Sequence, residues 1–361
     1  MNVRKTRVLI VDDSAIVRRV LSDMLSSHPQ IEVVATAPDP YVARDKILEL
    51  QPDVITLDLE MPRMDGISFL KRVMRFHPLP VVVVSSIATD GGAVALEALR
   101  LGAVEVLAKP GGPYTVEDLG QQIVHAVLAA GRSRVQALPA HEESSSGAPS
   151  QGPQATLAPV PFSSQAIVAI GASTGGVEAI REVLVRLPAN FPPVLIVQHI
   201  PRAFSGPLAE HLNRACALEV REALDTCELL PGQAWITPGD RHMEVRHVGA
   251  KRLAILNSNA PVNRHRPSVD VLFHSLARAG ARNAVGVLLT GMGADGAAGL
   301  LALRQAGAAT IAQDEKSSIV YGMPAEAVRM GAAEAVLPLK DIASGIMLVL
   351  SVSPARQMTR A

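Results

Sequence analysis

The chain has 361 residues, with 34 basic and 34 acidic side chains, and therefore no net charge at pH 7. This balance gives no indication of nucleic-acid binding, and the longest apolar stretch, Ile342–Val352, is too short for insertion across a membrane. The length suggests two domains, and the two cysteines, Cys216 and Cys227, lack the spacing of a metal or redox motif. Such cysteines suit a reducing cytosol and no signal peptide is expected, so we expect a cytoplasmic protein.

Residues 5–130 alternate short apolar runs with helical patterns. Strands are predicted at Val8–Val11, Ile31–Ala37, Val54–Leu57, Val81–Val84 and Val104–Ala108. The helical stretches include Ile16–Leu25, Ile67–Phe76, Ala93–Leu101 and Val116–Ala129. Five strands alternating with five helices predict an α/β domain with a doubly wound parallel sheet.

Polar side chains follow four of these strands, namely Asp12 and Asp13, then Asp58, then Ser85, then Lys109. Because the carboxyl ends of parallel strands meet at one edge of a sheet, we expect the three carboxylates to converge and to need a cation, for which Mg²⁺ is suited. Asp58 is then a candidate nucleophile toward a phosphoryl donor, with Lys109 and Ser85 contacting the phosphoryl oxygens. For Asp12 or Asp13 alone, a helix N-cap is the alternative.

Four motifs of this segment occur in order. They are Val11-Asp12-Asp13-Ser14, Leu57-Asp58, Met61-Pro62-Arg63-Met64-Asp65-Gly66 and Lys109-Pro110. In these motifs the segment resembles a response-regulator receiver domain with a flavodoxin-like fold. The resemblance implies that Asp58 accepts phosphate from a histidine kinase. It also implies that Asp13, Asp58 and the Glu60 carbonyl bind Mg²⁺, with Asp12 assisting through water, and that a cis bond precedes Pro110.

Residues 131–165 are rich in Ser, Pro and Gln and predict a flexible linker. From residue 166 to 352 the alternation resumes and predicts a second doubly wound, Rossmann-like α/β domain. Strands are predicted at Ala166–Ile170, Val194–Val197, Gln233–Ile236, Val285–Leu289 and Ala309–Ala312, with a helix at Val177–Val185 and a possible hairpin of Met243–Arg246 with Arg252–Leu256.

The segment Gly171-Ala172-Ser173-Thr174-Gly175-Gly176 connects the first of these strands to the helix. Small residues on both sides permit a sharp turn that exposes the Ser173 hydroxyl. The unpaired N–H groups at the helix start suit an oxyanion. Ser173 is therefore a candidate nucleophile, while a plain glycine-rich turn and a phosphate cradle remain alternatives for this motif alone.

Two further predicted strands also lead directly into segments with candidate catalytic residues, as the strand before Ser173 does. One leads into Gln198-His199-Ile200-Pro201, and the other leads into a loop that contains Asp295. Strand ends of one sheet can bring Ser173, His199 and Asp295 together. Ser173 would attack an acyl carbon, His199 would accept its proton, and Asp295 would orient the imidazole. Capping of the following helix is the alternative for Asp295. An ordinary surface or core role is expected for His211, His242, His247, His265 and His274.

The loop Gly291-Met292-Gly293-Ala294-Asp295-Gly296 is also a literal G-x-G-x-x-G, and Asp314 stands where a ribose-binding acid is expected. A dinucleotide-dependent oxidoreductase is thus one alternative. Charge argues against it, because Asp295 would lie at the helix N-terminus, where a pyrophosphate binds. A response regulator whose second domain only binds partners is another alternative.

Several motifs of the second half occur together. They are Ile170-Gly171-Ala172-Ser173-Thr174-Gly175-Gly176, Gln198-His199-Ile200-Pro201, Arg264-His265-Arg266-Pro267-Ser268-Val269-Asp270, Leu289-Thr290-Gly291-Met292-Gly293-Ala294-Asp295-Gly296 and Tyr321-Gly322-Met323-Pro324. In them the second domain resembles the catalytic domain of the bacterial chemotaxis protein-glutamate methylesterase (CheB) family. The resemblance implies that Ser173, His199 and Asp295 form a catalytic triad. It also implies that the oxyanion binds near Thr174 and Met292, chiefly through backbone N–H groups.

The resemblance further implies the reaction. Glutamyl methyl esters on chemoreceptors would be hydrolysed to glutamate and methanol, and selected glutamines would be deamidated, without a cofactor for the ester chemistry. A CheA-like histidine kinase and methyl-accepting chemoreceptors would be the partners. We expect a monomer that binds no nucleic acid and does not insert into a membrane.

Two hypotheses concern regulation and substrate contact. The order receiver, linker, hydrolase suggests that the unphosphorylated receiver packs near the Ser173 cleft and limits access, and that phosphorylation of Asp58 weakens this packing. The cluster Arg264-His265-Arg266 is interpreted as a solvated loop, with a contact to acidic receptor helices or to the carboxylate product as the alternative.

Overall fold

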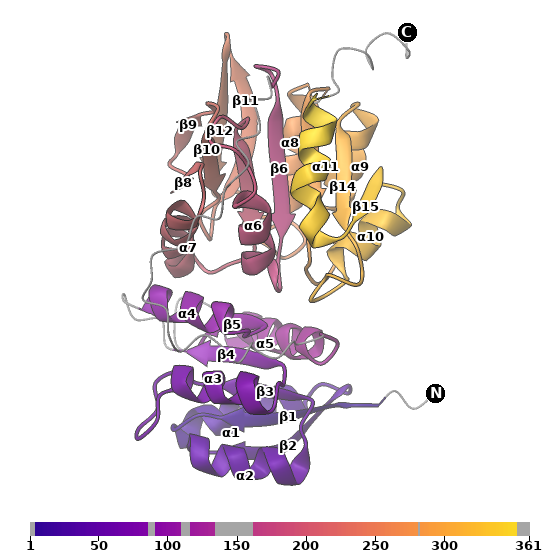
Figure 1. Cartoon of the computed structure of the whole chain (residues 1–361). Helices are drawn as coiled ribbons and strands as arrows, with labels where there is room; N and C mark the ends of the chain where they lie inside the picture. The colour runs from indigo at the N-terminus through magenta and orange to yellow at the C-terminus, as the bar shows by residue number, and fades with distance from the viewer. Residues whose placement is uncertain (1–3, 86–90, 110–115, 134–161, 281, 352–361) are drawn as a thin grey trace.

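Two α/β units make up the part of the chain that is described. The computed structural model describes residues 4–85, 91–109, 116–133, 162–280 and 282–351. In Figure 1 the N-terminal unit, drawn in indigo to purple, lies below the C-terminal unit, drawn in magenta to yellow.

The described N-terminal residues form a sheet of five parallel strands in the order β2-β1-β3-β4-β5. The strands are β1 (Thr6–Val11), β2 (Ile31–Ala37), β3 (Val54–Leu57), β4 (Val81–Ser85) and β5 (Glu105–Ala108). The helices are α1 (Ala15–Ser26), α2 (Pro40–Leu50), α3 (Gly66–Phe76), α4 (Gly91–Arg100) and α5 (Val116–Ala130). This confirms the predicted doubly wound fold and puts the ends of β1, β3 and β4 side by side.

The described C-terminal residues form a main sheet of seven parallel strands in the order β15-β14-β13-β6-β7-β10-β8. These strands are β6 (Ile167–Ala172), β7 (Val194–Gln198), β8 (Glu219–Glu222), β10 (Gln233–Ile236), β13 (Ala284–Leu288), β14 (Ala309–Gln313) and β15 (Ala335–Leu337). A small antiparallel sheet contains β9 (Thr226–Glu228), β11 (His242–Val248) and β12 (Lys251–Asn257), which confirms the predicted hairpin. The helices are α6 (Gly176–Leu184), α7 (Arg202–Ala215), α8 (Val269–Arg278), α9 (Ala297–Gln305), α10 (Met323–Arg329) and α11 (Leu339–Ser351).

The main sheet changes its winding direction at β6. Strands β7, β10 and β8 lie on one side of β6, and strands β13, β14 and β15 lie on the other. Every residue of β6, β7 and β13 is buried, as expected for parallel strands covered on both faces. In open parallel sheets, ligands bind outside the carboxyl ends of the strands at such a point.

Local sequence signals account for the starts of α1, α2 and α3. Ser14 caps α1 and accepts a hydrogen bond from the N–H of Val17, while Asp39 and Asp65 cap α2 and α3. The cap alternative for Asp12 or Asp13 is therefore wrong, since Ser14 holds that position.

Three short strands, β8, β9 and β15, were not predicted. Each has only three or four residues, and exposed side chains interrupt its apolar pattern. The predicted linker falls largely on residues 134–161, which lie outside the described residues, as does Pro110 with its expected cis bond.

The two units touch through α4 and α7. Leu96 of α4 belongs to a hydrophobic cluster of the C-terminal unit, and Phe204 of α7 belongs to a cluster of the N-terminal unit. A Cβ atom at Gly92 would lie 2.6 Å from Pro207 Cγ and 2.9 Å from the Ala203 carbonyl oxygen. The helices are therefore in contact at Gly92 without space for a side chain.

The apolar stretch Ile342–Val352 lies almost entirely in helix α11. It buries Ile342, Ala343 and Ile346 in the core of the C-terminal unit. Among the helices that are described, none is both long enough and apolar enough to cross a bilayer.

Candidate active site

The three candidate triad residues follow β6, β7 and β13, where the main sheet changes winding direction. The N–H of Ser173 donates to the Thr290 carbonyl at 3.0 Å, and the N–H of His199 donates to the Ala172 carbonyl at 3.1 Å. Ser173 and His199 line the same cavity, and the side chain of Asp295 contacts His199. The structure thus brings Ser173, His199 and Asp295 to one crevice.

Close packing holds the corner that carries Ser173. Gly175 is the N-cap residue of α6 and has a φ of 75°, a left-handed conformation that favours glycine. At Gly291 a Cβ atom would lie 2.7 Å from Ser173 Cβ, so the loop after β13 approaches the serine only because this residue is glycine. The amide of Gln198 donates to the Ser173 carbonyl at 2.8 Å and holds the backbone of the corner in place.

The ring of His199 is oriented by Asp295. Its Nε2 lies 2.9 Å from Asp295 Oδ2. Burial raises the pKa of Asp295, but the hydrogen bond and charge of His199 and further donors outweigh it and hold this pKa well below its usual range. A deprotonated carboxylate only accepts hydrogen bonds, so Nε2 carries the hydrogen and Nδ1 of the neutral ring carries the lone pair. His199 Nδ1 is buried and has no hydrogen-bond partner among the described residues, Ser173 included.

The carboxylate of Asp295 is held at the N-terminus of α8. It accepts hydrogen bonds from Asn263 Nδ2 at 2.8 Å, from Ser268 Oγ at 2.7 Å and from the N–H of Val269 at 2.7 Å. The helix dipole of α8 adds a favourable interaction with the negative charge. The expected alternative, capping of the following helix, is wrong, because α9 begins without a side-chain cap. Asp295 binds α8 and His199 at the same time.

Two backbone N–H groups near the serine are available for a ligand. Among the residues that the structure describes, no backbone carbonyl accepts from the N–H of Thr174 or of Met292. The Thr174 carbonyl accepts from Thr290 Oγ1 at 3.0 Å, which fixes the orientation of this segment. Unpaired donors of this kind, held on a rigid backbone, suit a developing oxyanion.

The acidic residues of the N-terminal unit converge as predicted. Asp12, Asp13 and Asp58 each place a carboxylate oxygen within 4.8 Å of the others. Lys109 Nζ lies 2.9 Å from Asp12 Oδ2 and 2.7 Å from Asp58 Oδ2. Burial raises the pKa of Asp58 against the opposing effect of the Lys109 ammonium. Three carboxylates at this spacing form an all-oxygen donor set, which fits Mg²⁺.

The remaining predicted residues of this edge lie beside Asp58. Ser85 is buried at the end of β4, and its carbonyl accepts the N–H of Lys109 at 2.8 Å. Glu60 is exposed, and its N–H donates to Asp58 Oδ1 at 3.3 Å. A Cβ atom at Gly66 would lie 2.2 Å from the Asp58 carbonyl oxygen, so the returning loop needs glycine there.

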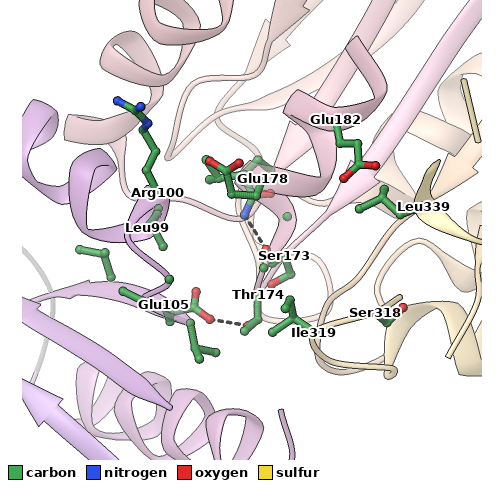
Figure 2. A pocket seen from close by; sticks show the side chains of 18 of the residues that line it. Leu99, Arg100, Glu105, Ser173, Thr174, Glu178, Glu182, Ser318, Ile319 and Leu339 are labelled. Atoms are coloured by element: carbon green, nitrogen blue, oxygen red, sulfur yellow. Dashed lines mark hydrogen bonds between the residues drawn. The ribbon is translucent and has the colours of Figure 1, made fainter. Parts of the chain in front are cut away.

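A cavity of about 930 Å³ lies between the two units at the Ser173 corner. Its lining includes Leu99, Arg100 and Glu105 from the N-terminal unit and Ser173, Thr174 and His199 from the C-terminal unit. Figure 2 shows α4 and β5 of the N-terminal unit facing this corner. The N-terminal unit therefore covers part of the cleft that contains Ser173.

Known proteins are similar in sequence to both units. The sequence matches the CheB methylesterase family over residues 168–346 and the response regulator receiver domain over residues 8–119. It is 50% identical over 343 residues to the protein-glutamate methylesterase/protein-glutamine glutaminase 2 of Syntrophus aciditrophicus, and the match covers 95% of this chain and 98% of that protein. The chain belongs to this methylesterase family.

Other members give the same result. The protein-glutamate methylesterase/protein-glutamine glutaminase of Salmonella typhimurium is 49% identical over 353 residues, which cover 97% of this chain and 99% of that protein. The crystal structure of the Thermotoga maritima CheB methylesterase catalytic domain superposes with a TM-score of 0.50 at 36% identity, covering 51% of this chain and 98% of that one. The N-terminal unit is thus the receiver domain and the C-terminal unit is the methylesterase domain.

Glu105 of the receiver domain reaches into the methylesterase cleft. Its carboxylate accepts a hydrogen bond from the Thr174 hydroxyl, as Figure 2 shows. The Glu105 side chain as a whole is half-buried, because it borders the cavity. Its carboxylate is nevertheless enclosed by residues of both domains. This burial raises the pKa of Glu105 to about 7, against the opposing effects of Thr174 and His199. The sequence offered no sign of this contact, which depends on how the domains dock.

His265 does not have the ordinary role expected from sequence. Its ring stacks on the ring of His199, with the centroids 3.8 Å apart and the planes 8° apart. The solvated-loop interpretation of its cluster holds for Arg264, which is exposed, whereas His265 and Arg266 are half-buried. His242 does have a satisfied core role, since its Nε2 and Nδ1 both make hydrogen bonds.

The dinucleotide alternative has little support from the geometry. Asp314, its candidate ribose-binding acid, accepts hydrogen bonds from the N–H of Ser317 at 3.0 Å and from the Ser317 hydroxyl at 2.5 Å within a local turn. Asp295, at the end of the glycine-rich loop, is held by His199 and α8.

Proposed function

We propose that this chain hydrolyses glutamyl methyl esters on chemoreceptors and deamidates receptor glutamines, under the control of receiver phosphorylation, in chemotactic adaptation. The observation that carries this proposal is the hydrogen bond between His199 and Asp295 beside Ser173, in a cleft that the receiver domain covers. The names of the relatives supply the two activities.

In the acylation step, Ser173 Oγ attacks the γ-carbonyl carbon of the ester while His199 Nδ1 accepts the hydroxyl proton. Asp295 stabilises the resulting imidazolium through Nε2–H. The carbonyl oxygen gains negative charge, which the N–H groups of Thr174 and Met292 stabilise. The C–O bond to the methoxy group then breaks, and the leaving methoxy oxygen takes the proton from His199 to give methanol.

Deacylation reverses these roles with water as the nucleophile. His199 removes a proton from water, which attacks the acyl carbon, and Ser173 Oγ leaves with the proton. The product is a receptor glutamate. With glutamine as the substrate, the first leaving group is ammonia and every later step is the same, so one triad serves both reactions.

The receiver site would perform phosphoryl acceptance from a CheA-like histidine kinase. Mg²⁺ would be held by Asp13, Asp58 and the Glu60 carbonyl, with Asp12 assisting through water, and when bound it would offset the charge of the phosphoryl oxygens. Asp58 would attack the phosphorus of the kinase phosphohistidine, the P–N bond would break, and the kinase histidine would leave. Lys109 then pairs with the phosphoryl oxygens, and the Ser85 hydroxyl donates a hydrogen bond to them.

We assign residues 5–130 to the receiver domain, 131–165 to a flexible linker and 166–352 to the methylesterase domain. The linker would keep the domains near each other while allowing the receiver to leave the cleft. We further propose a cytoplasmic monomer that acts on methyl-accepting chemoreceptors.

Methanol release from membranes that carry methylated receptors tests the proposed reaction. The wild-type chain is expected to release methanol and to convert receptor glutamines to glutamates, detected by the mass of the receptor peptides. A folded chain that releases no methanol from a cognate receptor would instead support the alternative that the second domain only binds partners.

Glu105→Gln is expected to remove a pH dependence of domain docking. The ordinary pKa of this carboxyl is 4.5 and rises to about 7 in the docked state, so the docked state binds the proton more tightly. Docking should therefore weaken as pH rises from about 4.5 to about 7, by up to about tenfold per pH unit, and change no further above that range. Glutamine does not titrate, and its carbonyl oxygen can still accept from Thr174.

The measured quantity is the ratio of methanol release with a phosphodonor to release without it, at several pH values. In the wild type this ratio should fall as pH rises through the window, because unphosphorylated protein opens. In Glu105→Gln it should stay flat and exceed the wild-type ratio at about pH 8. Parallel curves for the two proteins would show that Glu105 does not control docking.

Gly92→Val is expected to activate the unphosphorylated protein. The new side chain would collide with Pro207 and with the Ala203 carbonyl on α7, and such overpacking costs about 1–3 kcal/mol of docking free energy. Methanol release without a phosphodonor should rise about fivefold or more, with little change in the phosphorylated rate. The matched control is Ala93→Val on the exposed side of α4, which should keep the wild-type ratio.

A further inference from the structure

The turn that precedes α8 contacts both His199 and Asp295. Val262 and His265 exchange backbone hydrogen bonds of 3.0 and 2.9 Å across a tight turn. The two residues between them, Asn263 and Arg264, have φ values of 52° and 67°. Two successive left-handed residues are typical of a two-residue turn of fixed shape. The turn therefore holds its side chains in a defined position relative to the triad.

Each end of the His199–Asp295 pair receives one side chain from this turn. Asn263 Nδ2 donates to Asp295 Oδ1 at 2.8 Å and to Asp270 Oδ2 at 2.7 Å. The ring of His265 lies flat on the ring of His199, with an angle of 8° between the planes. Nearly parallel rings at a centroid distance of 3.8 Å are stacked in van der Waals contact.

Burial, aided by nearby positive charge, keeps the ring of His265 neutral. Burial, followed by the charge of His199, lowers the pKa of His265 to about 3. The negative charge of Asp295 raises the pKa of His265. The positive charges of His125, on receiver helix α5, and of the neighbouring Arg264 lower this pKa further. A neutral ring face can lie against the imidazolium that forms on His199 during catalysis, while a second cation at this distance would repel it.

We propose that His265 is a positioning residue that fixes the plane of the His199 ring, so that Nε2 stays on Asp295 and Nδ1 stays available to Ser173. The inference rests on the proposed function, because it assigns His265 a part in that reaction. Rotation of the ring about Cβ–Cγ out of this plane would turn Nε2 away from Asp295 and Nδ1 away from Ser173. The stack opposes this rotation, since a tilted ring would collide with His265.

Two variants separate the ring from its nitrogens. His265→Ala removes the stack and is expected to lower kcat for methanol release about 10- to 100-fold, with KM changed less than about twofold, since substrate does not need this contact to bind. His265→Phe keeps a neutral aromatic face and is expected to stay within about threefold of wild type. The pH profile of His265→Phe should match the wild-type profile, because residue 265 does not titrate in the working range.

A spectroscopic readout tests the same point without turnover. In the full chain labelled with ¹⁵N-histidine, His199 should show a single Nε2–H tautomer in wild type and in His265→Phe, and averaged ring-nitrogen shifts in His265→Ala. Phosphorylation of Asp58 and the melting temperature serve as controls for folding. If His265→Ala does not fold, His265→Leu, which also lacks the ring, replaces it, and its spectrum is compared with that of the wild type.

Either of two results would overturn the inference. One is a His265→Ala protein with unchanged kcat and tautomer. The other is a His265→Phe protein that loses as much activity as His265→Ala, since a nitrogen atom would then matter more than the ring face. Failure of wild type to release methanol would instead count against the proposed function, and the tautomer measurement would still test the placement of His265.

Discussion

Ser173→Ala is expected to lower methanol release from methylated receptors by at least about 10³-fold. The variant keeps His199, Asp295 and the unpaired N–H groups, but no atom remains to form the acyl-enzyme. Any residual hydrolysis would come from direct attack of water on a bound ester. The measurement is the initial rate of methanol release at saturating receptor, with the phosphodonor present so that docking does not limit the rate.

The control for this experiment is Ser164→Ala. Ser164 is exposed at the end of the proposed linker, just before the methylesterase domain, and its substitution should leave the rate unchanged. A Ser173→Ala protein that keeps more than a tenth of the wild-type rate would show that Ser173 is not the nucleophile. The reaction would then have to proceed by direct attack of water.

Asp295→Asn is expected to cost about 10³- to 10⁴-fold in kcat, in line with the loss of the carboxylate from a serine triad. Asparagine nearly preserves the shape but removes the charge that stabilises the imidazolium. Its amide can also donate to His199, which would favour the tautomer that has no lone pair on Nδ1. The rate of methanol release and the ¹⁵N shifts of His199 measure the two effects separately.

Asp270→Asn is the matched control for the second experiment. Asp270 is also buried at the start of α8, and it accepts hydrogen bonds from Asn263 and from the N–H of Gly299, but none from His199. It should lower kcat by less than about tenfold. Equal losses in the two variants would mean that the start of α8, and not the charge next to His199, controls the rate.

The sequence was sufficient to predict the receiver sheet, the five central strands of the main sheet and the strand ends that carry the candidate sites. Each of Ser173, His199 and Asp295 follows an apolar run that becomes a fully buried strand. A continuous apolar run followed by a polar residue predicts such a position, because parallel strands are covered on both faces and functional groups collect at their carboxyl ends. The same reasoning led to Asp12, Asp58 and Lys109.

Contacts that depend on how the domains and loops pack in three dimensions could not be predicted from the sequence pattern. Glu105 lies within an apolar strand of the receiver domain, and its partner, Thr174, lies 69 positions further along the chain. No local pattern relates the two. His265 was indistinguishable from the other histidines, because its stack on His199 requires the turn at Asn263 and Arg264, which no periodicity indicates.

The position of Asp295 shows why a cap was hard to predict from sequence. Residues directly before a helix often cap it, so α9 was the expected partner of Asp295. Instead the carboxylate accepts hydrogen bonds from Ser268 and Val269 at the start of α8, which precedes it in the chain and packs beside α9. Tertiary packing, and not sequence adjacency, decides which helix end receives the charge.

Phosphorylation of Asp58 is expected to control access to the cleft in which Ser173 hydrolyses receptor esters. The most direct test measures methanol release by the full chain from methylated receptor membranes, with and without a small phosphodonor and Mg²⁺, beside Asp58→Asn. We expect the phosphodonor to raise the wild-type rate and to leave Asp58→Asn at the basal rate. A wild-type protein that is phosphorylated on Asp58 and releases methanol no faster than before would contradict this expectation.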